Sequence, residues 1–348
     1  FVYRTSLYLS ATVLFLYVYN APPRHLGVRK VVFTLAAFWG IVVVGGFLGL
    51  AFPHVSFRTV TERALPRGFA TQPDVNALVH PKLAQLQRIL PGYPAVPRPA
   101  APFPYANGWG ANFALLTPFA LTAWTMVRSR TRKWALGGFM VASLFPFVVS
   151  LDRGAWFSLG LGLAYATLRF GLRGNRRALA GAVAALVLGV GVVALTPLGG
   201  VVVDRLKNPH SNEGRMLLYQ EAIKRTKESP VLGYGAPVKS VRPDTPSVGT
   251  HGQLWLVLVS HGVPAALLFF AWWIALLLRT RRGTAPFGVW GHAVVLISLL
   301  QMGFYEQLAA PIHITMVAAA LVLREMRARQ EGSAGQIAVQ VRELSTVG

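Results

Sequence analysis

The chain has 348 residues, of which 53% are hydrophobic and 13% charged, and this composition excludes a soluble globular protein of that length. It contains no cysteine, which excludes disulfides, thiolate metal sites and iron–sulfur clusters. The net charge of +22 is concentrated in Arg/Lys clusters between apolar stretches, without a DNA-binding module, so we expect anionic membrane lipid and no nucleic acid as a partner.

Apolar stretches long enough to cross the hydrocarbon core recur along the whole chain. A spanning helix needs about 20 such residues, and short basic connections between the stretches favour helices over a barrel. The pattern predicts an all-α fold, a polytopic transmembrane helical bundle that forms a single membrane domain over 1–348. The predicted spans are residues 2–20, 31–52, 106–127, 134–150, 154–170, 178–197, 250–278, 287–304 and 310–323.

Basic clusters follow the first, third, fifth and seventh of these spans, and by the positive-inside rule they mark cytoplasmic connections. The tail over 324–348 is also basic and is predicted to be cytoplasmic. The alternate connections are then external, and the long ones, 53–105 and 198–249, are expected to carry function. This arrangement places Phe1 outside, so we expect an odd number of further helices upstream.

Each long external segment is predicted to contain a short amphipathic helix. The first lies in HPKLAQLQRIL, over 80–90, and the second in NEGRMLLYQEAIKRTKES, over 212–229, where PVLGYG ends it. The apolar residues expected on one face of the first are Leu83, Leu86 and Leu90. Those expected on one face of the second are Met216, Tyr219 and Ile223.

Arg153, Arg215 and His251 are far apart in sequence but share the predicted external face. Arg153 lies at a tight turn between two spans, Arg215 in the first turn of the external helix, and His251 where the chain re-enters the membrane. A guanidinium binds phosphate as a planar fork, helix N-terminal N–H groups add donors, and a neutral imidazole can take a proton from a hydroxyl. Structural alternatives remain, because these Arg residues could form ion pairs or meet headgroups and a lone His is ordinarily structural.

Further candidates for substrate binding border the same face. Asn107, Trp109 and Asn112 lie at the outer mouth of the third span, where a ring could stack on sugar and amides could bond hydroxyls. Asp152 and Glu306 lie at external span ends, where a carboxylate could orient the base or pair with Arg. The alternatives are an interfacial aromatic belt and structural ion pairs.

Three blocks of sequence, in this order, resemble the bacterial O-antigen ligases and their polymerase relatives. SLDRGAWFSLGLGL resembles the Arg-Gly-Ala turn that enters a span in that superfamily. GRMLLYQEAIKRTKESPVLGYG resembles its Gly-Arg helix, and THGQLWLVLVSHGVPAALLFF resembles its His-Asn block. A fourth block, YANGWGANFALLTPF, weakly resembles the Asn-containing entry to an earlier span. Together they cover residues from about 105 to 278.

The resemblance implies a metal-independent, inverting glycosyltransferase without a cofactor. It would move a glycan from a polyprenyl-diphosphate carrier to a hydroxyl of a glycan, glycolipid or other acceptor, at the external face of the bacterial cytoplasmic (inner) membrane. Arg153 and Arg215 would hold the diphosphate and His251 would activate the acceptor. The alternatives are a polysaccharide polymerase of the same superfamily, or a transporter or flippase of lipid-linked saccharide.

The chain departs from the pattern of the superfamily at two positions beside these residues. Leu151 stands where the family has Ser, two residues before the Arg, and Gly252 stands where it has Asn, directly after the His. These departures put local substrate contacts in doubt. Family members have about twelve spans, so the resemblance implies about three helices upstream.

Overall fold

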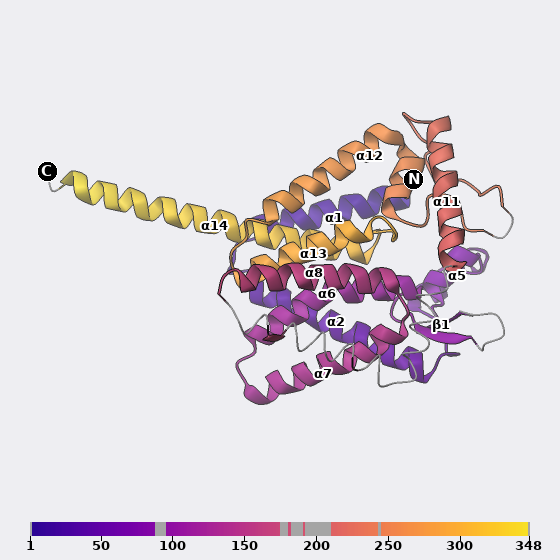
Figure 1. Ribbon diagram of the computed structural model, residues 1–348, viewed down its shortest axis with the longest axis horizontal. Coiled ribbons are helices and arrows are strands. Elements are labelled where there is room, and N and C mark those ends of the chain that lie inside the picture. The colour runs from indigo at the N-terminus through magenta and orange to yellow at the C-terminus, as the bar shows by residue number, and fades with distance from the viewer. Residues whose placement is uncertain are drawn as a thin grey trace.

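The computed structural model describes residues 2–87, 95–174, 210–242 and 245–346, together with 180, 181 and 191. These residues form a bundle of long helices with a small hairpin and a crossing helix at one end (Figure 1). The long helices are α1 (Val2–Asn20), α2 (Val28–Ala51), α6 (Ala106–Met126), α7 (Arg130–Val149), α8 (Arg153–Gly171), α12 (Gln253–Thr280), α13 (Pro286–Gln301) and α14 (Ala310–Thr346). The other elements are α3 (Val60–Ala64), α4 (Arg67–Ala70), α5 (Pro73–Val79), β1 (Ala84–Gln87), β2 (Val96–Pro99) and α11 (His210–Glu228).

The helical class predicted from hydropathy is confirmed. Every predicted span within the described residues coincides with a helix, and the one predicted over 178–197 lies almost wholly outside them. Among the described helices, α2, α7 and α12 are long and apolar enough to cross a membrane, and α13 is apolar but shorter. Their lengths match the roughly 30 Å that a helix must traverse.

The core of the bundle is organised around α13, which packs against α6, α8, α12 and α14, while α2 packs on α6 and α1 on α14. Two buried tryptophans join α2 to α6: Trp39 donates its indole N–H to Thr117 Oγ1 at 3.2 Å, and Trp109 donates to the carbonyl of Val42 at 2.8 Å. A buried indole N–H left without an acceptor would be costly, so these bonds fix how the two helices meet.

The hairpin of β1 and β2 replaces the helix predicted over 80–90, and that prediction was wrong. The strands pair antiparallel, with Ala84 opposite Pro99 and Gln87 opposite Val96. The cross-strand bonds to β2 satisfy the backbone groups that bonds within a helix would otherwise satisfy. Of the leucines that suggested a helix, Leu90 lies outside the described residues.

The amphipathic helix predicted over 212–229 is confirmed as α11, but its buried face differs from the predicted one. Met216 and Ile223 are exposed, whereas Leu218 and Ala222, one turn apart, are buried. These two pack against Val248 and Val259 in a small cluster of their own. The buried face of α11 was misassigned because it packs against the chain leading into α12, which the sequence pattern of α11 does not reveal.

The loop end of the bundle, as we call the end that carries β1, α5 and α11, lies opposite the C-terminal extension of α14 (Figure 1). There α11 runs across the direction of the bundle helices. Both long connections predicted to be external therefore contribute their described parts to one end of the molecule.

Candidate functional site

The turn between α7 and α8 places an acidic and a basic residue side by side at the loop end. Asp152 is the N-cap of α8, and its Oδ1 accepts from the N–H of Ala155 at 3.4 Å. Leu151, just before it, has a φ of 51°, an uncommon value for a branched residue that indicates local strain. Arg153 is the first residue of α8 and is half-buried. The orientation of this carboxylate is thus set by a tight turn.

Asp152 is buried against Tyr305, which lies in the connection between α13 and α14. The hydroxyl of Tyr305 donates to Asp152 Oδ1, while Oδ2 has no hydrogen-bond partner among the described residues. Burial raises the pKa of Asp152, and nearby Arg98 partly offsets that rise. Burial and the adjacent carboxylate hold the pKa of Tyr305 well above its ordinary value, so its hydroxyl stays neutral and donates.

Arg98, on β2, connects the hairpin to this turn. It is only 7% exposed, and its Nε donates to the carbonyl of Ser150 at 2.6 Å. Its other two nitrogens donate to Gln87 Oε1 at 2.6 Å and to Asn107 Oδ1 at 3.0 Å. Burial lowers the pKa of Arg98, although the charge of Asp152 opposes that effect. The guanidinium therefore ties β1, β2 and the start of α6 to the α7–α8 turn.

His251 precedes α12, and its neighbours determine which ring nitrogen carries a proton. Thr250 Oγ1 donates its single hydrogen to the carbonyl of Ser247 at 2.7 Å, and the same oxygen lies 3.1 Å from His251 Nδ1. With that hydrogen on Ser247, Nδ1 is the donor in the second contact. Nε2 of the neutral ring then carries a lone pair. Burial, reinforced by the charge of Arg215, lowers the pKa of His251 and favours this neutral form.

The backbone at His251 is held from two sides. Tyr219 on α11 donates its hydroxyl to the carbonyl of His251 at 3.2 Å and stacks on Trp255 with ring centroids 4.5 Å apart. Trp255 in turn donates to the carbonyl of Gly303 at 3.0 Å. Gly252 has a φ of 142°, and a Cβ there would lie 2.8 Å from the Gly303 oxygen. The close approach of these two segments thus requires glycine, which accounts for the departure from Asn.

The charge of Arg215 reaches both groups. It contributes to lowering the pKa of His251, and it also acts on Asp152, Tyr305 and Arg98. Because α11 begins at His210, Arg215 belongs to its second turn and not, as predicted, its first. The free N–H groups of the helix start therefore do not coincide with this side chain.

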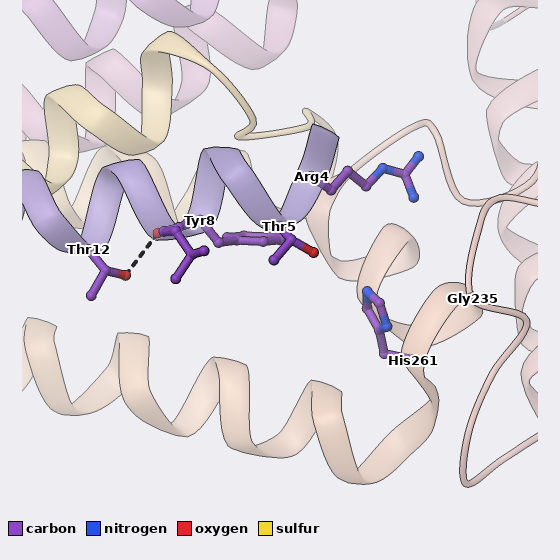
Figure 2. A pocket seen from close by; sticks show the side chains of 7 residues that line it. Arg4, Thr5, Tyr8, Thr12, Gly235 and His261 are labelled. Atoms are coloured by element: carbon purple, nitrogen blue, oxygen red, sulfur yellow. Dashed lines mark hydrogen bonds between the residues drawn. The ribbon is translucent and has the colours of Figure 1, made fainter. Parts of the chain in front are cut away.

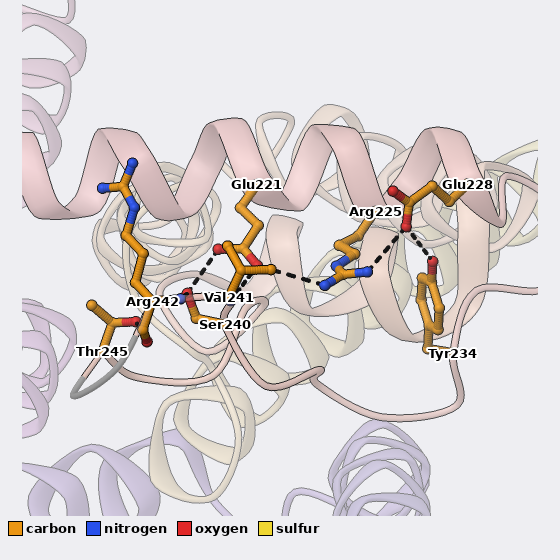
Figure 3. A network of polar contacts seen from close by, with 8 residues as sticks. All are labelled: Glu221, Arg225, Glu228, Tyr234, Ser240, Val241, Arg242 and Thr245. Atoms are coloured by element: carbon orange, nitrogen blue, oxygen red, sulfur yellow. Dashed lines mark hydrogen bonds and ion pairs between the residues drawn. The ribbon is translucent and has the colours of Figure 1, made fainter.

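The loop between α11 and α12 is fastened to α11 by a polar network (Figure 3). Glu221 accepts from the hydroxyl of Ser240 at 2.7 Å and from the N–H of Val241 at 3.0 Å. Two turns later, Glu228 accepts from Arg225 at 3.2 Å and from the Tyr234 hydroxyl at 3.0 Å. This loop clamp, formed by the acidic residues of α11, fixes the chain that leads to His251.

The other predicted substrate-binding residues have different placements. Trp109 is fully buried in the core, so its ring packs against protein and not against a sugar. Asn112 is 1% exposed and donates to the carbonyl of Gly108, one turn back in α6. Glu306 is exposed and interacts electrostatically with Arg4 of α1. Asn107 alone among these four contacts the group around Asp152, through Arg98.

Sequence reasoning missed Arg98 and Tyr305, which complete the surroundings of Asp152. Arg98 is flanked by prolines in a segment read as an irregular external loop, and Tyr305 precedes the more conspicuous Glu306. No motif or spacing in the sequence marks either residue, because each acquires its partners only when distant segments meet at Asp152.

Residues 138–270 match the model of a family described as O-antigen ligase. This stretch contains Arg153, Arg215 and His251, and it runs from α7 into the second half of α12. None of the curated proteins compared with the chain matches it. Together, the apolar helices and the family match indicate an integral membrane protein. The resemblance predicted from the sequence is thus confirmed over this part of the chain: residues 138–270 are similar to the O-antigen ligase family of membrane glycosyltransferases.

Proposed function

We propose that the protein is a metal-independent, inverting glycosyltransferase that moves a glycan from a polyprenyl-diphosphate carrier to an acceptor hydroxyl. The observation that supports this proposal is the charge of Arg215, which acts on both His251 and the Asp152–Tyr305 pair beside Arg153. The proposal places this proton acceptor and the two permanent cations around one substrate. Displacement of a diphosphate by a hydroxyl requires that combination.

His251 is the proposed general base. Its Nδ1 proton is committed to Thr250, so Nε2 is left to accept the proton of the attacking hydroxyl. The lowered pKa keeps the ring unprotonated at neutral pH. General-base catalysis of this kind contributes about 10²- to 10⁴-fold to the rate.

Arg153 and Arg215 are the proposed partners of the diphosphate. As the acceptor oxygen bonds to the anomeric carbon, the bond from that carbon to the diphosphate oxygen breaks, and the electron pair leaves with polyprenyl diphosphate. Negative charge therefore grows on the leaving group, where two guanidinium groups stabilise it. Attack opposite the leaving group inverts the anomeric centre.

The proposed place of reaction is the external face of the bacterial cytoplasmic membrane, facing the periplasm or the cell exterior. The basic clusters after alternate predicted spans support this orientation, because they put the loop end outside. A ligase transfers the glycan once, whereas a polymerase of the same superfamily would use a glycan of the donor type as the acceptor. The chemistry of the site serves both.

Release of polyprenyl diphosphate tests the proposal. Purified protein is incubated with polyprenyl-diphosphate glycan, a saccharide acceptor and EDTA, and we expect release that depends on the acceptor. His251→Ala should reduce the rate by at least about 10²-fold, the contribution of a general base. The matched control is His54→Ala, because His54 is an exposed histidine elsewhere at the loop end.

Two results would refute the proposal. Full activity of a folded His251→Ala protein would remove His251 as the base. Release that stops in EDTA and returns with a divalent cation would remove the metal-independent mechanism. Thermal unfolding of each variant establishes that it is folded before its rate is compared.

A further inference from the structure

A pocket of about 230 Å³ lies between the start of α1, the first half of α12 and the chain that leaves α11. Figure 2 shows residues of α1 on one side and the imidazole of His261 reaching up from α12 on the other. Its lining consists of Arg4, Thr5, Tyr8, Leu9, Thr12, Gly235 and His261. None of these belongs to the group around His251.

The polar groups of this α1–α12 pocket suit an anion. Arg4 supplies a permanent positive charge, and Tyr8 accepts a hydrogen bond from Gln253 Nε2 at 2.6 Å, which leaves its own hydroxyl hydrogen for a ligand. His261 adds a further ring N–H. No carboxylate is among the lining residues, but Glu306 interacts electrostatically with Arg4 from outside the pocket. A ligand phosphate would take over the role of that carboxylate.

The size and surroundings of the pocket indicate what would carry the anion. Its volume is below the roughly 300–1,000 Å³ of pockets that enclose drug-sized ligands, so only a headgroup fits inside. Exposed apolar side chains continue from it along both helices: Leu9 and Val13 on α1, and Leu267 and Leu268 on α12. The two helices diverge toward this end (Figure 1).

We propose that the α1–α12 pocket binds the phosphate of a membrane lipid, with the lipid chain lying along the apolar faces of α1 and α12. The guanidinium of Arg4, the phenol of Tyr8 and the imidazole of His261 form the polar end of the site. The exposed apolar side chains of α1 and α12 form its apolar part. This site is separate from the proposed catalytic residues. The inference therefore stands or falls independently of the proposed function.

Binding of two lipids that differ only in the phosphate tests the inference. Native mass spectrometry of the full chain is used to titrate dioleoyl phosphatidate and dioleoylglycerol. We expect phosphatidate to bind at least about tenfold more tightly, as a charge-assisted hydrogen bond would give. Arg4→Gln should remove this preference. Arg24→Gln, which neutralises an exposed arginine beyond the other end of α1, should retain it.

Glu306→Gln provides an independent test if Arg4→Gln fails to fold. Removing the competing carboxylate should strengthen phosphatidate binding by a few-fold, because Glu306 interacts electrostatically with Arg4 and would compete with the lipid phosphate for it. Equal binding of the two lipids, or equal effects of Arg4→Gln and Arg24→Gln, would overturn the inference. So would displacement of phosphatidate by excess inorganic phosphate, since the ligand would then be a free anion.

Discussion

The hydroxyl of Thr250 fixes the protonation pattern of His251, because its own hydrogen goes to the carbonyl of Ser247. We predict that Thr250→Val, which keeps the branched shape but removes the hydroxyl, lowers kcat about tenfold or more. Without its acceptor, the Nδ1 proton can move to Nε2, and a ring in that tautomer cannot accept a proton from the substrate. The measurement is the rate of polyprenyl diphosphate release at saturating donor and acceptor.

Thr250→Ser is the matched control for this prediction. It retains the hydroxyl that bonds both Ser247 and His251, so most of the activity should remain. If the Val and Ser variants lose activity to the same extent, the methyl group and not the hydroxyl is what matters at this position.

At the scale of elements, the loop clamp on α11 determines how firmly the chain before His251 is held (Figure 3). We predict that Glu221→Gln speeds amide hydrogen exchange over 238–242 by about five- to tenfold. The amide has one acceptor oxygen where the carboxylate has two, and a lost hydrogen bond is worth about 1 kcal/mol. Exchange is followed by mass spectrometry.

Glu228→Gln serves as the control for the clamp. Glu228 accepts from Arg225 and Tyr234 two turns further along α11, whereas the bonds of Ser240 and Val241 go to Glu221. Equal exchange over 238–242 in the two variants would show that Glu221 does not hold this loop.

Whether an element was predictable depended on whether its structure was decided locally. The long helices could be predicted from the length of their apolar stretches alone, and α11 from the helical spacing of its apolar residues. β1 was mistaken for a helix because its structure depends on pairing with β2, which lies further along the chain. The buried face of α11 was also mistaken, since Leu218 packs against Val248 and Val259 from a loop and from α12. Local periodicity carries no information about such partners.

At the scale of the whole molecule, burial and charge from distant segments determine the pH range over which His251 is unprotonated. Its pKa lies below the ordinary 6.5, through burial first and the charge of Arg215 second. Protonation abolishes a general base, so the midpoint of the acid limb of kcat/KM should lie below the ordinary imidazole value of 6.5. We predict that Arg215→Gln moves this acid limb to higher pH, because one cause of the lowered pKa is removed.

Lys224→Gln is the control for this shift, since Lys224 is an exposed cation on the same helix and does not contribute to the pKa of His251. It should leave the acid limb in place. An unchanged limb in Arg215→Gln, measured on its residual activity, would contradict the shared electrostatic environment.

The site illustrates the same limit of sequence reasoning on a larger scale. Arg153, Arg215 and His251 could be selected because their residue types suit the chemistry and their positions share a predicted face. Arg98 and Tyr305 could not, because their significance arises only where β2 and the α13–α14 connection meet Asp152. No spacing in the sequence records that meeting.

The break in α12 at Gly262 has a mechanical consequence. Gly262 has a φ of 79°, and the chain after α11 is bonded across the break: Val263 donates to Pro230 at 2.7 Å, Tyr234 to Val259 at 2.9 Å, and Gly235 to Ser260 at 2.8 Å. A change in the tilt of α12 must therefore drag this segment along or break these bonds. Helix tilt responds to bilayer thickness, which depends on lipid composition. We therefore expect the lipid composition of the membrane to affect the position of α11 and, through α11, the geometry around His251.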